Sequence, residues 1–118
     1  MERPLTGRLV LILEEEAIIA FDIADALQKV GAEPILASSL QDAFSLIESM
    51  SFSAAVLDYT MRHGNCAALC ERLSARGIPF VITSGMDGQY LAVRHLRKPL
   101  DTAGLIKTLE ELVERSSG

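Results

Sequence analysis

The sequence has no long hydrophobic runs, and its apolar segments are only as long as β-strands. The run from Leu9 to Leu13 is representative, and it is far shorter than the ~20 apolar residues that a membrane-spanning helix needs. The chain also lacks a basic amino-terminal stretch followed by an apolar segment and a cleavage site, which is the pattern of a secretory signal. We therefore expect no membrane partner and a cytoplasmic location.

Clusters of basic side chains are absent as well. The 118 residues include 11 Lys and Arg against 16 Asp and Glu, which gives a formal net charge of −5. The basic residues are scattered along the chain, whereas a nucleic-acid surface gathers them to neutralise phosphates. We therefore expect no nucleic acid among the partners of this chain.

Cysteine is scarce. The two cysteines, Cys66 and Cys70, are four residues apart in a segment with helical periodicity, so they share one face of the predicted helix. Two small buried apolar side chains are the favoured interpretation. His63 and the cysteines match no common zinc spacing, and a structural disulfide is not expected in the cytosol.

The apolar residues alternate between strand-like and helix-like periods. Continuous apolar runs predict buried strands at residues 9–13, 34–37, 54–58, 80–83 and 93–96. Helical spacing predicts helices that start near residues 19, 40, 66 and 102. This alternation predicts one α/β domain, a doubly wound five-stranded parallel sheet with helices on both faces and a core at about residues 8–115.

The segment from Gly85 to Ala92 is short for a helical crossover. It leaves eight residues between Ser84 and Val93, and two of them are Gly85 and Gly88. A parallel crossover with a packed helix takes at least ~10–12 residues, and glycine disfavours helix. We therefore expect the helix between the fourth and fifth strands to be short or missing.

Polar residues follow four of the predicted strands. These are Glu14-Glu15-Glu16, Asp58, Thr83-Ser84 and Lys98-Pro99. Each has an ordinary explanation by itself, because acids favour helix starts and Ser-Gly favours turns. The carboxyl ends of parallel strands meet at one edge of the sheet, where ligands bind in this architecture. The combination therefore predicts a functional site at that edge.

The chemistry of this combination is that of phosphoryl transfer. The carboxylate of Asp58 can attack phosphorus and form an aspartyl phosphate. Clustered carboxylates suit Mg²⁺, which also accompanies phosphate. The charge that develops on the phosphoryl oxygens needs a cation and a hydroxyl donor, which Lys98 and Ser84 can supply.

With these residues in this order, the chain resembles the receiver domain of two-component response regulators over nearly its whole length. The resemblance implies a flavodoxin-like fold with strand order 2-1-3-4-5, Mg²⁺ as cofactor and reversible phosphorylation. It assigns the phosphoacceptor to Asp58, the conserved lysine to Lys98, the switch hydroxyl to Ser84 (with Thr83 as the neighbouring alternative) and the metal ligands to Glu14, Glu15, Asp58 and the backbone carbonyl of Thr60.

The chain departs from the family pattern at four places. Glu15 stands where the main metal ligand is usually Asp, and the extra methylene shifts the carboxylate in a site that demands near-octahedral geometry. Met61-Arg62 replaces Met-Pro, Cys66 replaces a glycine, and His95 stands where many receivers have an aromatic residue. These changes predict weaker Mg²⁺ binding and altered switching.

The leading hypothesis is therefore a stand-alone receiver, not an enzyme in the usual sense. Its partners would be a sensor histidine kinase or histidine phosphotransfer protein, and a downstream protein target. The polar side of the last helix, with Lys107, Glu110, Glu111 and Glu114, could contact the target or form a homodimer. The alternative is a degenerate receiver that binds proteins without using phosphate. A phosphohydrolase is disfavoured because no second carboxylate closely follows Asp58.

Overall fold

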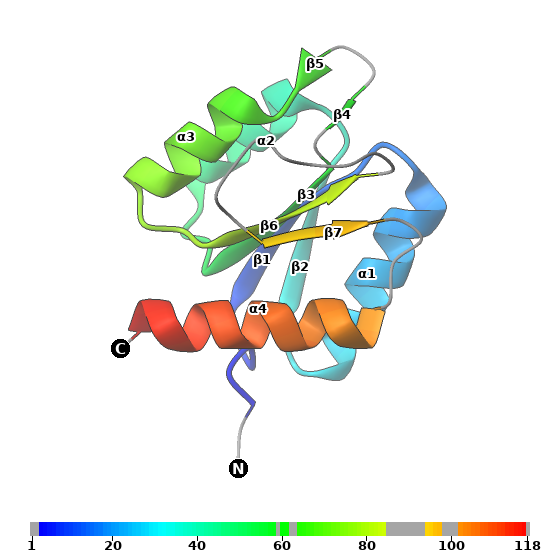
Figure 1. The fold of residues 1–118 in the computed structure, drawn as a ribbon, viewed down its shortest axis with the longest axis vertical. Coiled ribbons are helices and arrows are strands. Elements are labelled where there is room, and N and C mark those ends of the chain that lie inside the picture. Colours follow the sequence, from blue (N-terminus) through cyan, green and yellow to red (C-terminus); the bar gives the residue numbers. More distant parts are fainter. Residues whose placement is uncertain (1–2, 59, 62–63, 85–93, 98–101, 118) are drawn as a thin grey trace.

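The computed structural model describes residues 3–58, 60–61, 64–84, 94–97 and 102–117. Strands and helices alternate along the chain up to β3, which two short strands separate from the next helix (Figure 1). The strands are β1 (Leu9–Leu13), β2 (Glu33–Ala37), β3 (Ala54–Asp58), β4 (Thr60–Met61), β5 (Gly64–Asn65), β6 (Phe80–Ser84) and β7 (Arg94–Arg97). The helices of the described residues are α1 (Ala17–Lys29), α2 (Leu40–Ser49), α3 (Ala67–Ala75) and α4 (Thr102–Ser117).

The main sheet is parallel and has the order β2-β1-β3-β6-β7. The chain leaves β1, adds β2 on one side, and then crosses back to add β3, β6 and β7 on the other side. The reversal of direction between β1 and β3 is the topological switch point, outside which ligands bind in open α/β sheets. The predicted α/β architecture with a parallel sheet is confirmed.

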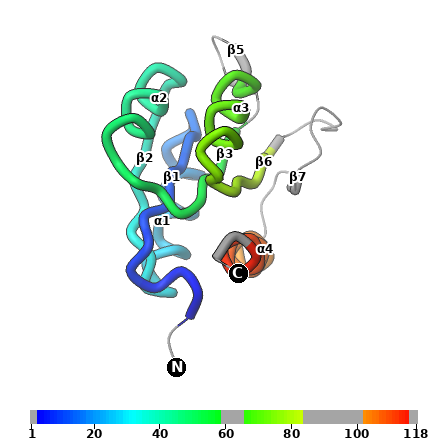
Figure 2. Tube along the Cα trace, turned by 90° about the vertical axis from the view of Figure 1, so that its left-hand side faces the viewer, coloured from blue at the N-terminus to red at the C-terminus, as the bar shows by residue number. Residues whose placement is uncertain are grey.

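The helices form a layer on each side of the sheet. Figure 2 shows α2 and α3 on one side of the strands and α1 with α4 on the other. The core is correspondingly split in two. Leu11, Leu13 and Leu57 pack with the buried faces of α2 and α3, whereas Val10, Ile12 and Val56 pack with those of α1 and α4. This alternation explains why the strands read as continuous apolar runs.

The amino-terminal segment is part of the core. Leu5 is fully buried against the α1 and α4 side, although it lies outside the predicted core of residues 8–115. Gly7 N–H donates to the carbonyl of Gly31 at 2.8 Å. Gly31 has a φ of +86°, and a Cβ there would lie 3.1 Å from the side chain of Thr6. The glycine that ends α1 therefore also permits the amino-terminal segment to pack closely.

A short hairpin follows β3, and a segment outside the described residues follows β6. Residues 60–65 contain a two-stranded antiparallel hairpin, β4 with β5, which the sequence analysis did not predict. The predicted short or missing fourth helix falls on residues 85–92, which lie outside the described residues, so that prediction stays open. Within the described ranges, no helix has the length and apolar character that a membrane crossing requires.

We expect α1 to depend on its inward face for stability. Ile23 is fully buried, whereas Ile18 on the same helix is 78% exposed. Ile23→Ala should lower the free energy of unfolding by about 2–5 kcal/mol, because it removes buried methyl groups and leaves a cavity. Ile18→Ala is the matched control and should change it by less than about 0.5 kcal/mol. Urea unfolding of both variants provides the measurement, and equal effects would contradict the assigned packing.

Candidate functional site

Asp58 is the last residue of the central strand β3. All five residues of this strand are buried, and Asp58 itself is 7% exposed. The strand lies between β1 and β6, in register with both of them. A carboxylate in this position is fixed by the sheet and still lies at its carboxyl edge, which is where the sequence placed the phosphoacceptor.

Glu14 lies next to Asp58 at the same edge. The paired residues Leu13 and Leu57 precede Glu14 and Asp58 directly. The backbone of Glu14 continues the β1 ladder, since its N–H donates to the carbonyl of Ala37 at 3.3 Å. Its side chain is 4% exposed, and its Oε2 accepts a hydrogen bond from the N–H of Glu16 at 3.2 Å. Two buried carboxylates therefore end two adjacent strands, which are about 4.8 Å apart.

The other predicted metal ligands lie in the loops that follow these strands. Glu15 is exposed, between the end of β1 and the start of α1. Thr60 is in β4, where its partner across the hairpin is Asn65. Glu14 and Asp58 are thus brought together by the sheet, and the metal-binding roles of Glu15 and the Thr60 carbonyl stay predictions.

Thr83 and Ser84 end the neighbouring strand β6. Thr83 is in register with Asp58 and is buried. Its hydroxyl donates to the carbonyl of Leu57 at 3.4 Å, so it bridges the two strands. Ser84 is in register with Arg97, the last residue of β7. Lys98 follows Arg97 in the chain and lies outside the described residues, so its role as the conserved cation stays a prediction.

Cys66 is a neighbour of Asp58 to which the sequence analysis gave no functional role. It is fully buried and is the N-terminal cap residue of α3. The pKa of its thiol is raised above the usual range, mainly by a hydrogen bond with Cys70, then by burial and to a smaller extent by the charge of Asp58. One sign in the sequence marks Cys66 as unusual, because it replaces the glycine that is common at this position. That replacement alone does not predict the contact between Cys66 and Cys70.

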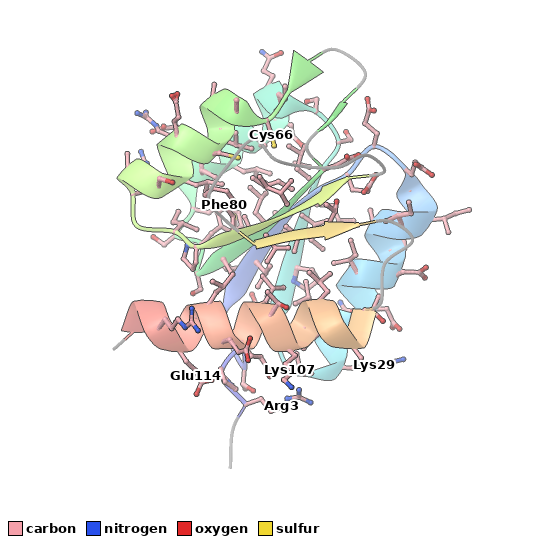
Figure 3. The ribbon with its side chains drawn as sticks, in the orientation of Figure 1. Arg3, Lys29, Cys66, Phe80, Lys107 and Glu114 are labelled. Atoms are coloured by element: carbon pink, nitrogen blue, oxygen red, sulfur yellow. The ribbon has the colours of Figure 1, made fainter. Side chains whose placement is uncertain are left out.

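The polar side of α4 is only partly available for docking. Lys107 and Glu114 are exposed, and Figure 3 shows both along this helix together with Arg3. Glu110 is different, because the guanidinium of Arg3 donates to both of its carboxylate oxygens, at 2.8 and 3.0 Å. Its side chain is 12% exposed. The ion pair with Arg3 therefore engages Glu110, which is one of the four residues that we predicted to contact a partner.

The donor set at the sheet edge fits a hard divalent cation in part. Glu14 and Asp58 offer buried carboxylate oxygens on adjacent strands, and Mg²⁺ prefers one or two carboxylates completed by carbonyl oxygen, water and phosphate. Among the residues that the structure describes, no three side chains of His, Cys, Asp or Glu gather closely enough to hold a metal. A site here would therefore rely on the two carboxylates and on oxygen atoms from the backbone or the phosphoryl group.

Curated relatives of this chain are bacterial regulators, although no family model matches the chain. It is 31% identical to the transcriptional regulatory protein PdtaR of Mycobacterium tuberculosis over 118 residues, which cover 92% of this chain and 58% of that protein. It is 25% identical to the regulator of RpoS of Escherichia coli, over 95% of this chain and 34% of that protein. The chain thus spans little more than half the length of the first of these relatives.

Solved structures cover nearly the whole chain. The solution structure of SdrG from Sphingomonas melonis is 30% identical, covers 93% of this chain and 98% of its own length, and has a TM-score of 0.78. The receiver domain of the Francisella response regulator 1452 has a TM-score of 0.82 at 22% identity, and a two-component response regulator from Clostridium difficile has 0.86 at 17% identity. These two show the fold, with at least 93% of this chain covered. The chain belongs to the family of response-regulator receiver domains.

Proposed function

We propose that this receiver domain accepts a phosphoryl group on Asp58 and signals by changing its protein–protein interactions. The observation that supports the proposal best is the placement of Asp58, a buried carboxylate that ends the central strand beside a second buried carboxylate, Glu14. Paired carboxylates at the carboxyl edge of a parallel sheet are the oxygen ligands that Mg²⁺ takes beside a phosphoryl group. A bound cation or a phosphoryl transfer step would explain why two buried carboxylates lie together at this edge of the sheet.

In the proposed reaction, an Asp58 carboxylate oxygen attacks the phosphorus of a phosphohistidine or a small phosphodonor. The new P–O bond forms as the bond from phosphorus to the donor breaks. We assign to Lys98 the neutralisation of the phosphoryl oxygens and to Ser84 the donation of a hydroxyl hydrogen bond to them. Thr83 is the weaker candidate for the hydroxyl role, since its Oγ1 already donates to the carbonyl of Leu57.

Mg²⁺ is the cofactor that we propose, and bound there it would offset the negative charge that builds up on the phosphoryl group. Glu14 and Asp58 would hold it with the Thr60 carbonyl, and Glu15 would reach it from the exposed loop that precedes α1. This chain's own contribution is to fix the two buried carboxylates through the register of β1 and β3.

The partners that we propose follow from this chemistry. The phosphodonor is a sensor histidine kinase or a histidine phosphotransfer protein, and a downstream protein target reads the phosphorylated state. We place both in the cytoplasm and propose no enzymatic activity beyond phosphoryl transfer to Asp58 and its loss by hydrolysis. The exposed residues of α4, such as Lys107 and Glu114, offer a surface for the target or for a second copy of the chain.

A degenerate receiver, which binds proteins independently of phosphate, is the second candidate. The observation in its favour is Glu15, which replaces the usual aspartate and whose side chain is exposed in this structure. The intact combination of Asp58, Ser84 and Lys98 opposes this candidate. The two readings differ in one property, which is whether Asp58 can be phosphorylated.

We expect Asp58 to be the site of covalent labelling by a small phosphodonor such as acetyl phosphate. Asp58→Asn should abolish the label, because an amide oxygen is a far weaker nucleophile than a carboxylate. Asp22→Asn, at an exposed aspartate of α1, is the matched control and should keep it. Intact-mass spectrometry with Mg²⁺ present gives the measurement. Labelling of the Asp58→Asn variant at the wild-type level would rule out the phosphoacceptor assignment.

We expect Glu15→Asp to tighten Mg²⁺ binding by up to about tenfold, since the shorter side chain restores the ligand reach that is usual in the family. Glu16→Asp changes the adjacent exposed glutamate and should leave the affinity unchanged. Titration of Mg²⁺ followed by NMR chemical shifts compares the three proteins. Weaker or unchanged binding in the Glu15→Asp variant would show that the site is built around glutamate.

A further inference from the structure

The two cysteines are in direct contact inside the core. The Sγ atoms of Cys66 and Cys70 are 3.7 Å apart, and the two side chains are 0% and 2% exposed. Cys70 is one turn after Cys66, and its N–H donates to the Cys66 carbonyl at 2.8 Å. Figure 3 shows Cys66 at the start of α3, on the side that faces the sheet. Neither thiol is in a disulfide.

The contact between Cys66 and Cys70 lies close in the chain to the proposed phosphoacceptor, Asp58. Asp58 ends β3, the hairpin of β4 and β5 follows, and Cys66 is the residue at which the chain enters α3. The charge of Asp58 acts on the Cys66 thiol and raises its pKa, after the larger effects of Cys70 and burial. Because only the short hairpin separates Cys66 from Asp58 along the chain, a covalent change at Cys66 can displace the strand end that carries the carboxylate.

The two thiols differ in acidity, as a nucleophilic and a resolving cysteine do. The hydrogen bond between the two sulfurs, which are 3.7 Å apart, raises the pKa of Cys66 and lowers the pKa of Cys70. The thiolate is the form of cysteine that reacts with oxidants. Cys70 is the thiol whose pKa the pairing lowers, and the Cys66 sulfur lies in van der Waals contact with it.

We propose that Cys66 and Cys70 form a dithiol oxidation site, at which a peroxide converts the pair into a disulfide that hinders phosphorylation of Asp58. The Cys70 thiolate attacks one peroxide oxygen, the O–O bond breaks, and the departing hydroxide takes a proton to become water. The Cys66 sulfur then displaces the oxygen of the Cys70 sulfenic acid as a second water, and the S–S bond forms. Two electrons pass from the two sulfurs to the peroxide, and both thiol protons end in water.

The effect on Asp58 follows from geometry. A disulfide needs Cβ atoms about 3.5–4.5 Å apart, whereas residues four apart on a helix have Cβ atoms ~5–6 Å apart. Closing the bridge must therefore tighten the entry into α3, where Cys66 is a cap residue outside the regular helix. The movement is passed to the β4–β5 hairpin that connects Cys66 to Asp58. A displacement of about 1 Å at a reacting group can slow a reaction a hundredfold.

Oxidation with hydrogen peroxide tests the disulfide itself. The wild-type protein should lose two hydrogens, a mass decrease of about 2 Da, and should have no free thiols when alkylated after denaturation. A dithiol reductant should restore both. Cys66→Ala and Cys70→Ala each lack one partner and should show no such loss, with circular dichroism as the check on their folding. Two alkylatable thiols in the oxidised wild-type protein would overturn the proposal, and this readout is independent of phosphorylation.

The second arm measures labelling of Asp58 by acetyl phosphate in the reduced and oxidised wild-type protein. This arm rests on the proposed function, and we expect labelling to slow by at least about tenfold on oxidation and to recover on reduction. Equal labelling of both forms, with the disulfide present, would overturn the link to Asp58. Absence of labelling in the reduced protein would instead refute the proposed function, while the disulfide arm still decides the chemistry of the cysteines.

Discussion

The burial of β3 on both faces, with a hydrogen-bonded strand on each edge, is the constraint on which the rest of this structure depends. Every residue of the strand from Ala54 to Asp58 is buried. Its apolar residues therefore pack alternately against the two helical layers. The strand must therefore stay in one register with β1 and β6, because a slip of one residue would exchange its two faces. The backbone of a residue at the end of such a strand is fixed by the pairing on both sides.

The position of the site follows from this constraint. The register with β1 puts Glu14 beside Asp58, and the register with β6 puts Thr83 on the other side. The strand pairing thus holds the carboxylates of Glu14 and Asp58 side by side at the carboxyl edge of the sheet. Two carboxylates on adjacent strands supply oxygen ligands of the kind that Mg²⁺ prefers. The proposed Mg²⁺ site and the proposed phosphoacceptor are two consequences of the same strand pairing.

The sequence predicted the strands well because their apolar runs are a direct consequence of burial on two faces. Leu9–Leu13 and Ala54–Asp58 have the predicted bounds. It did not predict the burial of Leu5, since a lone apolar residue has no period, nor the β4–β5 hairpin, whose strands have two residues each. It placed Cys66 and Cys70 on one face but could not show that their sulfurs touch. Asp58 and Glu14 were predictable as a pair because the resemblance to receiver domains implied the strand order that puts β1 beside β3.

The most direct test of the paired carboxylates is the free energy of unfolding in urea, measured with and without Mg²⁺. Free Mg²⁺ at about a hundred times its dissociation constant should stabilise the wild-type protein by about 2.7 kcal/mol. Glu14→Gln should lose most of the gain that Mg²⁺ provides, because it removes one of the two carboxylates that we propose to hold the ion. A wild-type protein that Mg²⁺ does not stabilise, or a Glu14→Gln variant that Mg²⁺ stabilises as much as wild type, would contradict this account.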